Sequence, residues 1–259
     1  MGEAKRGNIT GTRLRRLREP SAPRALSKLV LPAGIALPSR DFANHAAAIA
    51  EEIRRRVRAQ LVRGSAHGAL AKLRDAIDAI GAASVAAFED ALRRAVADNA
   101  ERGAEMAKIQ CRRGCAFCCH VTVVVTPLEA IRLARHDASR GRAPAQAGDA
   151  TVRFAPCPLL VDGACSVYDI RPFACRSLFS LDAARCEAGY GGAQEATVPS
   201  LDWPRLLSCG YITGQIAALD DLGLTSRLIE LKPALALRTR DATALPRWLN
   251  GEDVFPHAA

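Results

Sequence analysis

The sequence predicts a mainly α-helical fold, in which an N-terminal helical hairpin packs beside an irregular, cysteine-rich domain with a short strand and a helical C-terminal cover. Three observations lead to this fold class. Aromatic residues are only 5% of the 259 residues and alanine is abundant, which favours helices packed through small side chains. Two long segments before residue 106 have a helical hydrophobic period. Glycine and proline interrupt the segment with most of the cysteines, so irregular backbone is expected there.

Residues 1–40 are expected to form a basic, disordered leader. They contain nine Lys or Arg residues against two Asp or Glu residues, whereas the other 219 residues are close to neutral. Such an arm can contact phosphates, but it is more typical of a solvated segment, and the neutral remainder argues against binding to nucleic acid. Pro32 and Pro38 interrupt the apolar run near its end, so no export signal is expected. Because no uncharged apolar stretch reaches about 18 residues, we predict no membrane span and a cytoplasmic location.

Residues 41–105 are predicted to form a helical extension. The first helix begins at Asp41, a suitable N-cap, and ends near Gly64. The second begins at Leu70 and continues to Gly103, with one face repeating at steps of three and four residues. That face comprises Leu73, Ile77, Ile80, Ser84, Phe88, Leu92 and Val96. Two such helices would pair as an antiparallel hairpin, and residues 41–103 could also support self-association.

Residues 106–259 are predicted to form a cysteine-cluster domain with a helical C-terminal segment. Val121–Val125 is expected to be a short buried strand. The sequence Thr126-Pro127-Leu128-Glu129 then has the pattern of a capping box, which predicts a helix of about three turns with Glu129 as a capping residue. A polar loop should follow over residues 138–156.

The remaining elements of this domain are expected to be short turns and two helices. Helical turns are predicted after Pro172 and after Asp182, within backbone that glycine and proline otherwise break. Helices are predicted from Asp202 to about Leu222 and from Thr225 to Arg238, where they would cover the cysteine region.

Nine cysteines are many for a reduced compartment unless most of them bind metal. Without an export signal, metal-binding thiolates are favoured over disulfides. The odd number also leaves one thiol unpaired in any complete disulfide scheme. The cysteines occupy positions 111, 115, 118, 119, 157, 165, 175, 186 and 209.

The first four cysteines have the close spacing of metal ligands. Thiolate is a soft ligand for zinc or iron–sulfur clusters, and a spacing of two or three residues lets one turn direct two sulfurs at one ion. Cys115 and Cys118 have this spacing directly, and Cys111 can join them from the preceding turn. Cys118 and Cys119 are adjacent, and neighbouring side chains usually point apart. They would therefore bind different metals, or one of them would be a supporting or buried thiol.

The spacing of Cys111, Cys115 and Cys118 also matches the three-cysteine motif of radical S-adenosylmethionine enzymes, which bind a 4Fe-4S cluster. Those enzymes continue with repeated strand–helix units after the motif. Here 141 cysteine-rich residues follow Cys118 without such alternation. The context therefore argues against this class, although the motif alone leaves it open.

Several blocks in order resemble the CxxCxxCC family of zinc- or iron-chelating proteins, also called YkgJ-like. They are CRRGCAFCC, CPLL, GACSVY, RPFACR and RCEAGYG, which together extend from about residue 108 to residue 190. Three residues rather than two separate the first cysteine pair, so Cys111 departs from the family pattern. The resemblance implies that the metal ligands are Cys111, Cys115, Cys118, Cys119, Cys157, Cys165, Cys175 and Cys186. Cys209 lies outside the blocks and is expected to be a buried thiol.

The resemblance implies a metal-binding protein without fixing the metal. Eight thiolates can hold two zinc ions in closed sites, whereas a 4Fe-4S cluster would use four and leave spare thiols. A similarity to the cysteine region of flagellin lysine methylases keeps open an iron–sulfur enzyme of the methyl-transfer or radical type, and the basic leader keeps open a zinc protein that binds nucleic acid. The sequence identifies no catalytic residue, and whether the chain is an enzyme stays open.

Other residues in the matched blocks are expected to support the site. Arg171 and Arg176 flank Cys175 and could donate hydrogen bonds to carbonyls of the cysteine loops or offset thiolate charge. Tyr168 is expected to plug the region, with its hydroxyl bonded to backbone. His120 is expected to be a capping residue near the surface rather than a metal ligand.

Overall fold

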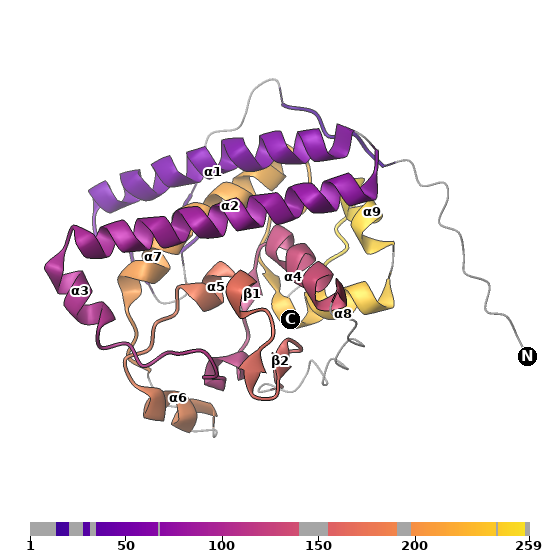
Figure 1. Cartoon of the computed structure of the whole chain (residues 1–259). Helices are drawn as coiled ribbons and strands as arrows, with labels where there is room; N and C mark the ends of the chain where they lie inside the picture. Colours follow the sequence, from indigo (N-terminus) through magenta and orange to yellow (C-terminus); the bar gives the residue numbers. More distant parts are fainter. Residues whose placement is uncertain are drawn as a thin grey trace, which may run out of the picture.

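The computed structural model describes residues 14–20, 28–31, 35–66, 68–139, 155–190, 198–241 and 243–256. Within these ranges the chain is mainly helical, with two small antiparallel sheets of two strands each (Figure 1). The predicted fold class is confirmed. The helices form a layer at one side of the molecule, and the cysteine-rich segment lies beneath it.

The predicted hairpin is formed by α1 (Arg40–Ala66) and α2 (Leu70–Ala97), two long helices that lie side by side (Figure 1). Helix α2 ends earlier than expected. Asn99 begins a separate helix, α3 (Ala100–Met106), because its side chain accepts a hydrogen bond from the backbone N–H of Arg102 at 3.0 Å. The predicted single helix from Leu70 to Gly103 is therefore two helices, with the break at an N-cap residue.

Helix α7 (Asp202–Asp221) packs closely against α1. Two glycines allow this approach, because a Cβ atom at Gly210 would lie 2.9 Å from Ala46 O and one at Gly214 would lie 2.5 Å from Ala50 O. The buried Arg54 of α1 also donates two hydrogen bonds to the carboxylate of Asp221. The C-terminal segment thus packs on the N-terminal hairpin and shares its hydrophobic core.

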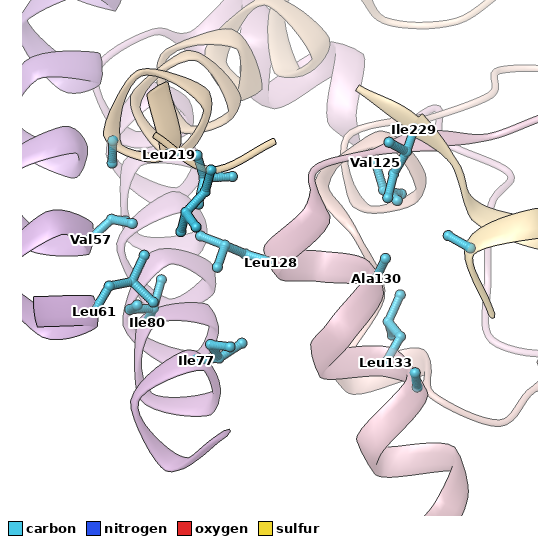
Figure 2. Close-up of a cluster of buried hydrophobic side chains, with 14 of the residues drawn as sticks. Val57, Leu61, Ile77, Ile80, Val125, Leu128, Ala130, Leu133, Leu219 and Ile229 are labelled. Atoms are coloured by element: carbon cyan, nitrogen blue, oxygen red, sulfur yellow. The ribbon is translucent and has the colours of Figure 1, made fainter. Parts of the chain in front are cut away.

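Helix α4 (Pro127–Ser139) connects that core to the small sheet of β1 (Val124–Val125) and β4 (Ile229–Glu230). Figure 2 shows Leu128 of α4 among side chains of α1, α2 and α7, with Val125 and Ile229 together in the sheet. Helices α8 (Leu231–Arg240) and α9 (Ala244–Leu249) complete this side of the fold.

Two predicted elements differ from the structure. The strand expected over residues 121–125 is confined to its last two residues, and Val121 and Val124 are exposed. The helix expected from Thr225 begins only at Leu231, because Ile229 and Glu230 pair with β1 as strand β4. Most of the predicted loop over residues 138–156 lies outside the described residues.

Two pieces of the N-terminal leader lie against the folded chain. Leu17 is 4% exposed, and its backbone N–H donates to Ser65 Oγ at 3.0 Å. The N–H of Val30 donates to Thr213 Oγ1 of α7 at 2.8 Å.

The three predicted domain ranges, 1–40, 41–105 and 106–259, stay predictions. Among the described helices, none combines the length and the apolar character that crossing a bilayer requires.

Candidate metal centre

The first cysteine block follows α3 as a tight turn and a short 3₁₀ helix, η1 (Phe117–His120). Gly114 has φ +89°, a conformation that favours glycine, and it lets the N–H of Cys115 bond to Arg112 O at 3.1 Å. The 3₁₀ helix carries Cys118 and Cys119. Close spacing in sequence is thereby converted into four thiols within one compact turn region.

The second block begins with a hairpin of β2 (Leu160–Val161) and β3 (Ala164–Cys165). Asp162 and Gly163 both have positive φ, which is typical of the tight Asp-Gly hairpin turn. The sequence contained this signal, but the hairpin was not predicted. Its strands place Cys165 opposite Leu160, and the N–H of Cys157 donates to Cys119 O at 2.7 Å. This backbone hydrogen bond joins the two cysteine blocks directly.

Glu129 connects α4 to the helical turn that carries Cys175. The predicted capping box is confirmed: Thr126 N–H donates to Glu129 Oε2 at 2.9 Å, and Glu129 N–H donates to Thr126 Oγ1 at 3.3 Å. The other carboxylate oxygen, Oε1, accepts from the N–H of Phe173 at 2.7 Å, at the start of α5 (Phe173–Arg176). Burial raises the pKa of Glu129, and these hydrogen bonds oppose the rise. Glu129 is therefore a bridge as well as a cap.

Four thiols from both blocks form what we call the inner thiol group: Cys118, Cys157, Cys165 and Cys175. All four are half-buried. Burial raises the pKa of Cys175, and negative charge on the other three thiols would raise it further, so the four sulfurs are close enough to interact electrostatically. The pKa of each of the other three is raised as well. In the metal-free protein these thiols are protonated at neutral pH, and metal binding would release their protons.

Three further thiols form the outer thiol group: Cys111, Cys115 and Cys186. Ser180 contacts two of them, because its N–H donates to Cys111 Sγ at 3.1 Å and its hydroxyl accepts from Cys186 Sγ at 3.1 Å. Cys186 is carried by α6 (Ala183–Tyr190), where Arg185 N–H donates to Asp182 Oδ1. Partial burial raises the pKa of Cys111, the hydrogen bond from the Ser180 N–H lowers it, and negative charge on Cys115, Cys118 or Cys186 would raise it further.

The thiols of Cys118 and Cys119 do not point apart as expected. A hydrogen bond between the two side chains raises the pKa of Cys118, followed by burial. The tight 3₁₀ turn, unlike an extended chain, allows adjacent sulfurs to meet. Cys119 also lies near Lys232 of α8, whose ammonium group donates to His120 O at 3.3 Å and to Ala155 O. Lys232 was missed by sequence reasoning because it is far from both blocks in the chain.

Arginine side chains surround Tyr168 at the edge of the inner thiol group. The guanidinium groups of Arg171 and Arg113 lie 3.9 Å and 4.7 Å from the ring centroid of Tyr168. Tyr168 thus makes cation–π contacts with both arginines, whereas the sequence had predicted only a packing role for its ring. Arg176 donates to Asp169 O at 2.6 Å, which confirms the predicted bond to a carbonyl of the cysteine loops. The positive charge of Arg171 acts to lower the pKa of Cys118 and of Cys165, against the larger effects that raise both.

Among the described residues, the thiols of each group lie near one another but do not converge on one point where a metal ion could bind. All nine cysteines are free thiols. Over the described ranges, no three cysteine, histidine, aspartate or glutamate side chains converge closely enough to hold a metal ion. The chemistry of the donors nevertheless fits zinc or iron, since both blocks supply soft sulfur ligands close together. Side-chain rotation within each group would have to complete a coordination shell.

The comparison with known families matches the same part of the chain. Residues 110–190 match the CxxCxxCC family model, described as "Putative zinc- or iron-chelating domain". The segment is thus similar to this family, and we refer to residues 110–190 below as the CxxCxxCC domain. The family resemblance drawn from the cysteine blocks is confirmed, and the CxxCxxCC domain contains both thiol groups and Cys119. No curated protein and no solved structure matches the chain.

Cys209 lies outside the CxxCxxCC domain, within α7. It has no exposed surface, and its thiol donates to Arg205 O at 3.5 Å. Burial raises its pKa to about 11. The interpretation of Cys209 as a buried thiol is confirmed.

Proposed function

We propose that this chain binds zinc or an iron–sulfur cluster through the cysteines of its CxxCxxCC domain. The observation that carries the proposal is the inner thiol group, in which Cys118 of the first block lies beside three thiols of the second. The hydrogen bond from Cys157 N–H to Cys119 O supports it, because this bond holds the blocks together without a metal. The proposed ligands are Cys111, Cys115, Cys118, Cys119, Cys157, Cys165, Cys175 and Cys186.

The surrounding residues would serve a thiolate site in two ways. Arg171 would offset the negative charge of thiolates at Cys118 and Cys165, and Lys232 would do the same for Cys157 and Cys119. Glu129 and the β2–β3 hairpin would hold the backbone that presents Cys175 and Cys165. A bound zinc ion would cross-link the loops, whereas a 4Fe-4S cluster would add redox capacity and use four of the thiols.

Metal and sulfide analysis of anaerobically purified protein tests the proposal. Zinc without acid-labile sulfide indicates the zinc form, and iron with equal sulfide and a brown visible spectrum indicates the cluster. Cys175→Ser should lower the metal content, whereas Cys209→Ala, which changes a cysteine outside the CxxCxxCC domain, should leave it unchanged. Protein that acquires neither metal after anaerobic reconstitution would contradict the proposal.

A further inference from the structure

We propose that a pocket between helices α4, α8 and α9 binds a small, neutral and largely apolar molecule that carries a hydrogen-bond acceptor. The pocket has a volume of about 550 Å³, and none of its described lining residues is a cysteine. Small-molecule sites typically have volumes of roughly 300–1,000 Å³ and a mainly apolar lining. Figure 1 shows the three helices at the end of the molecule opposite to α3. The proposal does not rest on metal binding.

The walls of the pocket come from four separate segments of the fold. Helix α4 contributes Ile131, α8 contributes Leu237, α9 contributes Leu245, and the C-terminal segment after α9 contributes Val254 and Phe255. The first four of these side chains are only half-buried, although all are apolar. A ligand that covers their remaining surface would therefore be stabilised by the hydrophobic effect.

The wall made by the C-terminal segment is held from outside the pocket. Arg227, which is not a lining residue, donates to the backbone oxygen of Phe255 at 2.7 Å and to the carboxylate of Asp253 at 3.1 Å. On the other side, the Phe255 ring lies edge-on to the ring of Trp248 in α9, with the centroids 6.4 Å apart. The backbone of this wall is thus preformed, so binding does not have to order the segment.

The charged side chains around the pocket favour a neutral ligand. Arg135 forms ion pairs with two aspartates of α2, and Asp241 forms one with Arg247. Arg74 is exposed, so water already solvates its charge. A charged group inside the pocket would have to break one of these pairs or stay without a counter-charge, and burying an unpaired charge is costly. A neutral molecule avoids that cost.

The acceptor is inferred from the indole group of Trp248. Trp248 is a lining residue without exposed surface, and its Nε1 has no hydrogen-bond partner within the described ranges. Buried donors are nearly always hydrogen-bonded, and an unpaired one destabilises the protein. A ligand oxygen that meets this N–H after a small side-chain rearrangement, which commonly accompanies binding, would pair it. A ketone, ester or amide should therefore bind better than a hydrocarbon.

NMR of the isotope-labelled full chain, with 2-decanone as the probe, tests the proposal. The chain has two tryptophans, and Trp203→Phe leaves only the indole N–H signal of Trp248. In wild type, 2-decanone should shift the Trp248 signal downfield and saturably. The Trp203 signal should stay unchanged, because that indole N–H already donates to Glu105. Decanoate and decylamine, which have alkyl chains of similar length and opposite charges, should bind about 10-fold or more weakly.

A pair of leucine variants locates the site. Leu237→Gln makes the lining more polar and should weaken 2-decanone binding by about 5-fold or more. The matched control is Leu92→Gln in α2, because Leu92 is also a half-buried leucine against the core but does not line the pocket. It should leave binding unchanged, and circular dichroism would verify the fold of both variants.

Three results would overturn parts of the proposal. The absence of a saturable Trp248 shift, or equal weakening by Leu237→Gln and Leu92→Gln, would overturn the pocket as a binding site. Decanoate or decylamine binding as tightly as 2-decanone would overturn the neutral ligand class. A saturable upfield shift of the Trp248 signal would contradict the hydrogen bond to the ligand.

Discussion

Glu129 shows how one buried side chain can hold together parts of the site that are distant in sequence. Its two carboxylate oxygens accept from Thr126 N–H and from Phe173 N–H, and Phe173 is 44 positions away. The capping half of this arrangement was predictable, because a capping box uses residues three positions apart. The bond to Phe173 was not, since no local pattern specifies which distant N–H a carboxylate will meet.

Replacement of Glu129 by glutamine should destabilise the protein. Glutamine keeps one acceptor oxygen and replaces the other by an amide group, so one of the two backbone N–H groups loses its partner. A buried unpaired donor costs about 1–3 kcal/mol of unfolding free energy. Urea unfolding of metal-free protein measures the loss. Glu187→Gln, at an exposed position of α6, should change stability by no more than about 0.5 kcal/mol, and equal effects of the two changes would refute the bridging role.

At the scale of elements, the hairpin of α1 and α2 was predictable and its packing partner was not. The apolar face through Leu73, Ile77 and Ile80 is a local, periodic signal, and these residues are buried as expected. The contact of α7 with α1 depends on Gly210 and Gly214, which in the sequence look like ordinary interruptions of a helix. Only the approach of the α1 backbone explains why a side chain is absent there.

Replacement of glycine by alanine should have opposite effects on protein stability at Gly214 and at Gly103. Gly214→Ala should destabilise the fold by about 1–3 kcal/mol, because the new Cβ atom would lie 2.5 Å from the backbone oxygen of Ala50. Gly103→Ala in α3 should stabilise it by about 0.5–1 kcal/mol, since that Cβ would meet only Val96 Cγ1 at 3.8 Å. Thermal and urea unfolding of both variants measure the difference. A neutral Gly214→Ala would mean that α1 and α7 are not held at this distance.

The candidate site combines local signals with contacts that no local pattern reveals. The eight cysteines proposed as ligands were chosen from spacing and family resemblance, and that choice stays a prediction. The helical turns that carry Cys175 and Cys186 were expected after Pro172 and Asp182, and the structure has them there. The division into thiol groups was not predicted, because it depends on Ser180 and Lys232 meeting the blocks in space. Neither residue has a sequence signature that separates it from ordinary surface or loop residues.

At the scale of the whole molecule, two kinds of stabilisation are separated in space. The helices α1, α2, α4 and α7 share a hydrophobic core that includes Leu61, Phe88 and Leu219, all fully buried. The cysteine-rich segment has only short strands and short helices, and its thiols are half-buried apart from the exposed Cys111. The helical part should therefore be stable by packing, whereas residues 157–190 should depend on bound metal for much of their order.

Metal removal should consequently loosen one part of the molecule and spare the other. Strong chelation, or Cys175→Ser, should increase proteolytic cleavage within residues 157–190, because the energy of metal binding is the folding energy of that segment. The helices within residues 41–103 should stay resistant, since their apolar side chains remain packed against α4 and α7. Limited proteolysis with mass mapping of the fragments measures this, with metal-loaded wild type and Cys209→Ala as references. Unchanged cleavage within residues 157–190 after metal removal would show that the backbone bonds through Glu129 and Cys157 are sufficient to order the CxxCxxCC domain.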